Sequence, residues 1–135
     1  MSQRSTPTRS QRSPQPHTGK IEIARVYDEV GQDPSRRILV DRLWPRGLAK
    51  SKAPFAVWAK DVAPSTELRK WYDHAEERFD EFARRYHDEL TRSPRLEALE
   101  VLREQIGGGD AVLLTATKVL AYSHASELRE VLARP

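Results

Sequence analysis

The feature that most constrains the fold is a run of three consecutive aliphatic residues, Ile38-Leu39-Val40, inside residues 37–44. A strand with one face in water alternates apolar and polar side chains, so consecutive aliphatics indicate a strand that is covered on both faces. Residues 111–117 form a second apolar run of strand length, and helical patterns lie between the two runs. A strand that returns to a sheet after helices predicts an α/β layer architecture with a parallel pair of strands.

Local patterns predict the remaining elements. Residues 20–28 alternate like a strand, residues 29–35 are typical of a turn, and Pro45-Arg46-Gly47 predicts a type I turn with Arg46 at its tip. Apolar spacing and capping residues predict helices over residues 53–62, from Ser65, over about 75–91, from Ser93-Pro94 to Ile106, and from about Ser123. The fold class is therefore α/β, a single small layered domain of three or four strands flanked by about five helices.

The first 20 residues differ in composition from the rest of the chain. They are rich in Ser, Arg, Gln and Pro and contain no aliphatic side chain beyond Met1, which predicts a disordered tail. A single domain over residues 21–135 follows, since this length suffices for one core. The chain contains neither the apolar core of a secretory signal nor the roughly 20 apolar residues of a membrane span. These features predict a cytoplasmic protein without a membrane partner.

The formal net charge of +3 is the sum over segments whose net charges differ in sign. The tail carries four bases and no acid, whereas residues 36–70 carry nine bases against three acids and residues 71–104 carry ten acids against six bases. The tail and the 36–70 surface predict weak, non-specific nucleic-acid or protein binding as an alternative function. The opposite charges of the two inner segments also suggest a homodimer.

The basic segment contains a candidate anion site. Arg42 and Arg46 flank the end of the second strand, and ligands of open α/β sheets bind beyond the carboxyl ends of the strands. Guanidinium groups suit phosphate or carboxylate oxygens, and the helix start at Ser65 favours an anion. We expect a small phosphorylated or carboxylated ligand to bind this cluster: Arg42, Arg46, Lys60, Ser65 and Arg69.

The same cluster has a structural interpretation. Asp41 shares a strand face with Leu39 and Leu43, so Arg42 or Arg69 can pair with it in an internal salt-bridge network. Trp44, Trp58 and Trp71 are then core residues rather than ligand platforms. The sequence leaves this alternative open.

Candidates for chemistry are few, and the sequence does not decide whether the chain is an enzyme. If it is one, Asp41 and His74 are the acid/base candidates. Past the last strand, a second polar group can line the same cleft as Arg42 or lie in a solvated loop: Thr115, Thr117, Lys118 and Tyr122.

Several cofactor classes lack support. Cysteine is absent, and His74, His87 and His124 have no short ligand spacing, so neither a disulfide nor a metal site is predicted. Gly107-Gly108-Gly109 precedes a strand, where a helix-ending loop is expected rather than a phosphate cradle. No cofactor is predicted.

Two long motifs carry a family resemblance: residues 37–47, RILVDRLWPRG, and residues 58–71, WAKDVAPSTELRKW. With Phe82, Tyr86, Glu89-Leu90 and the closing His124-Ala125, they resemble the YeaO-like family, domain of unknown function 488, over about residues 21–133. The family differs here in having Gly near Ser35-Arg36 and Asn in place of Ser123. The resemblance implies a small cytoplasmic α/β protein and no particular activity.

Overall fold

The computed structural model describes residues 19–28 and 34–134. The expectations for residues 1–18 and for the turn over residues 29–33 lie outside these ranges. Gly19 and Lys20, included in the predicted tail, instead pair with the loop before the last strand: Gly19 N–H donates to Gly108 O (2.9 Å). A Cβ on Gly19 would lie 2.2 Å from the Gly109 carbonyl carbon, so this close approach requires glycine.

Within the described residues, four parallel strands form one sheet in the order β1-β4-β2-β3. This confirms the α/β fold class and extends the expected parallel pair to every strand of the sheet. The strand bounds are β1 Ile21–Arg25, β2 Arg37–Leu39, β3 Val57–Trp58 and β4 Ala111–Thr115. Because all strands run the same way, their carboxyl ends lie along a single edge of the sheet.

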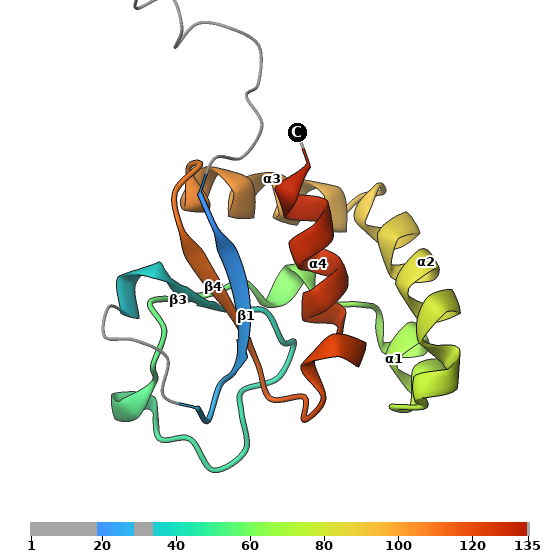
Figure 1. Cartoon of the computed structure of the whole chain (residues 1–135), viewed down its shortest axis with the longest axis horizontal. Helices are drawn as coiled ribbons and strands as arrows, with labels where there is room; N and C mark the ends of the chain where they lie inside the picture. Colours follow the sequence, from blue (N-terminus) through green and yellow to red (C-terminus); the bar gives the residue numbers. More distant parts are fainter. Residues whose placement is uncertain (1–18, 29–33, 135) are drawn as a thin grey trace, which may run out of the picture.

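The four α-helices of the described part of the chain lie on one side of the sheet, with α2 and α4 side by side (Figure 1). Their bounds are α1 Thr66–Tyr72, α2 Phe79–Leu90, α3 Arg95–Ile106 and α4 His124–Ala133. No helix within residues 19–28 and 34–134 has the length and apolar content needed to cross a membrane.

The aliphatic run Ile38-Leu39-Val40 is covered on both faces of the sheet, as predicted. Ile38 and Val40 belong to the main core between sheet and helices, whereas Leu39 packs on the opposite face. There residues 41–56 cover the sheet, and Trp44 meets Phe55 edge-on with ring centroids 5.4 Å apart. A connection rather than a helix therefore forms the second covering layer.

The helix predicted over residues 53–62 is wrong. Val57 and Ala59 pack on one sheet face while Trp58 between them packs on the other, which is the alternation of a strand. The edge of β2 supplies the reason, because Ala59 N–H donates to Leu39 O (2.8 Å). Pairing with the sheet outweighs the local helical spacing, and the segment becomes β3 followed by a 3-10 turn over Lys60–Val62.

Other boundaries also differ. The second strand ends at Leu39 rather than near Trp44, because Asp41 directs its side chain to β4 and the chain leaves the sheet. The turn after it spans Pro45 to Leu48, with Gly47 at φ +80° in the third position, which is the type II geometry and not type I.

The helix predicted from Ser93-Pro94 begins at Arg95, because the Ser93 hydroxyl donates to the Glu97 carboxylate (2.5 Å) rather than capping a backbone N–H. The predicted helix over 75–91 is confirmed as α2, which begins at Phe79 after a 3-10 turn over Glu76–Arg78. Ser65 caps α1 as expected, accepting from Leu68 N–H (3.1 Å). Gly107 ends α3 at φ +64°, as a helix-ending loop requires.

Candidate functional site

A cleft of about 700 Å³ opens at the carboxyl ends of the strands. Tyr27 follows β1, Asp41 follows β2 and Ala116 follows β4, so three chain segments distant in sequence meet there. Helix α1 and the start of α4 close the remaining walls. This is the edge at which open α/β sheets bind ligands.

Three of the predicted arginines line this cleft: Arg42, Arg46 and Arg69. Arg42 and Arg46 extend from the segment after β2, and Arg69 extends from α1. The backbone of the turn is held in place, since Tyr27 Oη–H donates to Arg46 O (2.8 Å) and Trp44 Nε1–H donates to Leu48 O (2.6 Å). The fold thus brings together guanidinium groups that are up to 27 residues apart in the sequence.

The cleft has an excess of positive charge. Arg42, Arg46, Arg69 and Lys70 are exposed, and none forms an ion pair with any residue in the described ranges. Among the described wall residues, four cationic side chains face two carboxylates, a net of +2 with the histidines neutral. The predicted salt-bridge network between Asp41 and Arg42 or Arg69 is therefore not what the structure contains.

Asp41 has a different partner. Its Oδ2 accepts from Ala116 N–H (2.8 Å), and its Oδ1 lies 3.3 Å from His124 Nε2. The Asp41 carbonyl accepts from Trp58 Nε1–H (2.7 Å). This one residue therefore joins the ends of β2 and β4 to the start of α4 and to β3, and its side chain is only 17% exposed.

His124 lies at the base of the cleft with a side chain 12% exposed. Its Nε2 is 3.0 Å from Val40 O, and since carbonyl and carboxylate oxygens only accept, Nε2 carries the proton. Burial lowers the pKa of His124, and Arg69 acts in the same direction, whereas Asp41 and the Val40 carbonyl oppose them. The imidazole is neutral at pH 7, and its Nε2–H is directed to the Val40 carbonyl, while the buried Asp41 Oδ1 lies beside it without a hydrogen-bond partner among the described residues.

The two acid/base candidates, Asp41 and His74, both line the cleft. His74 follows α1 with φ +55°, and Asp73 before it has φ +48°. Two successive non-glycine residues in the left-handed region are unusual, and this backbone turns His74 to the cleft wall. The imidazole that contacts Asp41 is nevertheless that of His124 and not that of His74.

Lys60 and Ser65 do not line the cleft. The Lys60 ammonium lies 5.3 Å from the centre of the Trp58 ring. Ser65 donates from its N–H to Glu89 Oε1 (2.9 Å) and from its hydroxyl to Glu89 Oε2 (2.5 Å). A carboxylate of the protein thus occupies the position at which an anion was expected.

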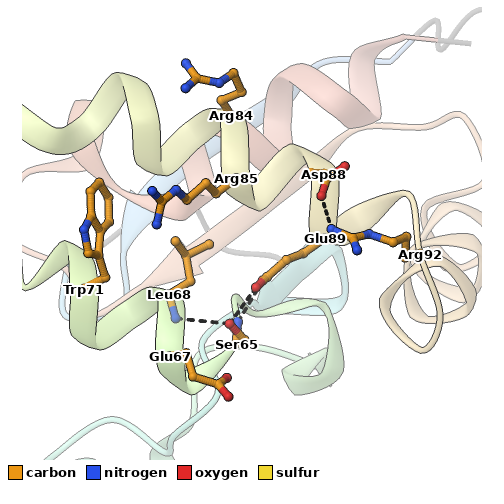
Figure 2. A pocket seen from close by; sticks show the side chains of 9 residues that line it. All are labelled: Ser65, Glu67, Leu68, Trp71, Arg84, Arg85, Asp88, Glu89 and Arg92. Atoms are coloured by element: carbon orange, nitrogen blue, oxygen red, sulfur yellow. Dashed lines mark hydrogen bonds and ion pairs between the residues drawn. The ribbon is translucent and has the colours of Figure 1, made fainter.

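Ser65 lies instead in a groove between α1 and α2, here called the α1–α2 surface (Figure 2). Arg85 reaches toward Trp71, with its guanidinium 4.4 Å from the ring centroid, while Arg84 points away from the groove. Both arginines pair with Glu81, and Arg92 pairs with Asp88. The basic side chains of this surface are engaged by the protein itself.

The second predicted cluster is partly assembled at the cleft. Thr117 and Tyr122 line the cleft, and Lys118 lies in an adjoining hollow. Thr115 is fully buried and its hydroxyl donates to the hydroxyl of Thr117 (3.1 Å). The three tryptophans, expected as core residues, are each half-buried.

Sequence reasoning missed the pairing of His124 with Asp41 and the position of Lys70. Lys70 carries no signal of its own, because it is one of several bases in an exposed helix turn. His124 did have a sequence signal, because it belongs to the closing His-Ala motif of the family resemblance.

Comparison with known proteins identifies the family of this chain. A family model described as the inactive DUF488-N3 subclade matches residues 20–135. The chain belongs to this DUF488 family. The YeaO-like resemblance is thereby confirmed.

Uncharacterised relatives of this DUF488 chain are known from mycobacteria and Escherichia coli. Protein Rv3073c of Mycobacterium tuberculosis and protein Mb3100c of Mycobacterium bovis are each 47% identical over 113 residues, which cover 84% of this chain and 93% of each relative. YeaO of Escherichia coli is 43% identical over 72 residues, covering 53% of this chain and 63% of YeaO. No solved structure matches.

Proposed function

We propose that this DUF488 protein binds a small phosphorylated or carboxylated ligand in the cleft at the carboxyl ends of β1, β2 and β4. The observation that carries the proposal is the set of three guanidinium groups on its walls, those of Arg42, Arg46 and Arg69, which have no ion-pair partner among the described residues. An unpaired guanidinium offers a planar fork of donors that matches phosphate or carboxylate oxygens.

The proposal is binding without chemical conversion. Asp41 is the candidate general base, but its Oδ2 already accepts from Ala116 N–H and its Oδ1 is buried against His124, so neither oxygen is available to a ligand. A general base needs a free oxygen within hydrogen-bond reach of the proton that it removes. The description of the family as an inactive subclade agrees with a binding role.

Binding of inorganic phosphate, ribose 5-phosphate and citrate to the full chain, measured by calorimetry and thermal shift, tests the proposal. Arg46→Ala and Arg69→Ala each remove a charged hydrogen-bond donor, and we expect each to weaken binding of the ligand by about tenfold or more. Lys60→Ala is the matched control, because Lys60 lies outside the cleft. If none of the three anions binds, or if Arg46→Ala binds them like the wild type, the proposal is wrong.

A further inference from the structure

A second hollow of about 420 Å³, here called the annex, adjoins the cleft. The two share five wall residues: Tyr72, His74, Ala116, Thr117 and Tyr122. Three further residues line the annex but not the cleft: Glu76, Lys118 and Val119. Because the walls are shared, one ligand can extend from the arginines of the cleft into the annex.

Exposed apolar side chains gather at this combined site. Five large apolar residues are exposed among those described, and four of them border the cleft or the annex: Tyr27, Leu43, Val119 and Tyr122. Val119 is 44% exposed and Tyr122 is 39% exposed. Large exposed apolar groups that cluster around a hollow mark a binding site rather than ordinary surface.

Tyr122 is fixed in position before any ligand arrives. Its carbonyl accepts from Tyr72 Oη–H (2.7 Å), and its ring meets Phe79 edge-on with centroids 5.5 Å apart. A pre-ordered aromatic ring loses little conformational freedom when another ring stacks on it. The annex wall therefore suits a flat, unsaturated group.

Charge orients the ligand along the combined site. The arginines line the cleft, whereas the described residues of the annex include one acid, Glu76, and one base, Lys118, so the annex carries no net charge. The carboxylate of Glu76 accepts hydrogen bonds, as an amino group or ring N–H requires. One end of the site thus fits an anion and the other fits a nitrogen-bearing ring.

We infer that the ligand is a nucleoside monophosphate, bound with its phosphate at Arg42, Arg46 and Arg69 and its base against Tyr122 and Val119. The inference rests on the proposed function, because it assigns the phosphate to the same arginines. Stacking of a base on an aromatic side chain strengthens binding roughly tenfold to a hundredfold. A sugar phosphate without a base lacks this contribution.

Calorimetry on the full chain with adenosine 5′-monophosphate, ribose 5-phosphate and adenosine tests the inference. We expect the nucleotide to bind about tenfold or more tightly than ribose 5-phosphate. Tyr122→Ser should reduce this ratio to within about threefold. Val119→Thr, which keeps the side-chain shape at an exposed position, should reduce the ratio in the same direction without affecting folding. Val101→Thr, exposed on α3 away from the site, is the matched control.

The outcomes separate the two proposals. Equal affinity for the nucleotide and ribose 5-phosphate, with both lost in Arg46→Ala, would overturn the inference and support the anion site. A nucleotide preference that neither Tyr122→Ser nor Val119→Thr reduces would also overturn it. Binding of neither phosphate would overturn the proposed function and the inference together.

Discussion

The cleft and the α1–α2 surface are both rich in arginine, but their arginines are in opposite states. On the α1–α2 surface, Arg84 and Arg85 pair with Glu81. Arg92 pairs with Asp88 (Figure 2). In the cleft, Arg42, Arg46 and Arg69 have no ion-pair partner among the described residues. The first region uses its charges within the protein, and the second presents them to solvent.

The acids of the two regions explain the difference. Glu81 and Asp88 lie on α2 and pair with arginines three or four residues further along the chain, a spacing at which such pairs form locally. Asp41, by contrast, is bound by the Ala116 N–H and lies against His124. Because Asp41 holds the edge of the sheet together, it does not neutralise the arginines of the cleft. Basic residues that lie near an acid in the sequence are therefore not always paired with it.

The largest expected effect concerns Glu89, which holds the start of α1. Glu89→Ala removes two hydrogen bonds to Ser65, and we expect the free energy of unfolding to fall by about 3 kcal/mol, measured by urea denaturation. Glu67→Ala, an exposed acid of the same surface, is the control. Anion binding in the cleft should stay unchanged in the folded variant. A loss equal to that of Glu67→Ala would contradict the capping role.

Removing Asp41 should affect stability and binding in opposite directions. Asp41→Ala leaves the Ala116 N–H without its acceptor, which should lower the free energy of unfolding by about 2 kcal/mol. It also removes a negative charge from the cleft, so phosphate should bind about threefold more tightly. Asp61→Ala, an exposed acid outside the cleft, should change neither quantity. Weaker phosphate binding in the folded Asp41→Ala variant would argue that the carboxylate itself orients the ligand.

His124 should make the cleft region sensitive to acid. Burial lowers the pKa of His124 in the folded state, so below about pH 6.5 the unfolded chain binds a proton that the folded chain does not. Stability therefore falls as the pH decreases from 7.5 to 5.5. The difference between urea curves of the wild type and His124→Gln, recorded at both values, isolates this contribution from the exposed histidines. Parallel pH profiles would show that His124 titrates normally.

The smallest effect is expected for the paired arginines of the α1–α2 surface. Arg84 is 73% exposed, and exposed pairs contribute little, so Arg84→Ala should change the free energy of unfolding by less than about 0.5 kcal/mol. It should also leave phosphate affinity at the wild-type value, in contrast to Arg46→Ala. Loss of phosphate binding in Arg84→Ala would place the anion site on the α1–α2 surface instead of the cleft.

Local sequence signals correctly predicted the elements that depend on their own residues rather than on contacts with distant segments. The run Ile38-Leu39-Val40 predicted a strand covered on both faces, the Ser65 cap predicted the start of α1, and Gly107 predicted the end of α3. The spacing of Phe55, Trp58 and Val62 predicted a helix and failed, because the edge of β2 is available for pairing. Spacing records which side chains are apolar, and it cannot record which backbone groups lie across from them.

For the candidate site too, some features follow from the sequence and others only from the tertiary structure. The sequence by itself determined the fold class, the family and the presence of a basic segment after the second strand. Only the tertiary structure decided that Arg69 joins Arg42 and Arg46 while Ser65 turns to Glu89, and that Asp41 meets His124. The physical reason is that helix and strand periods act over a few residues, whereas charge pairing depends on contacts made between segments far apart in the chain.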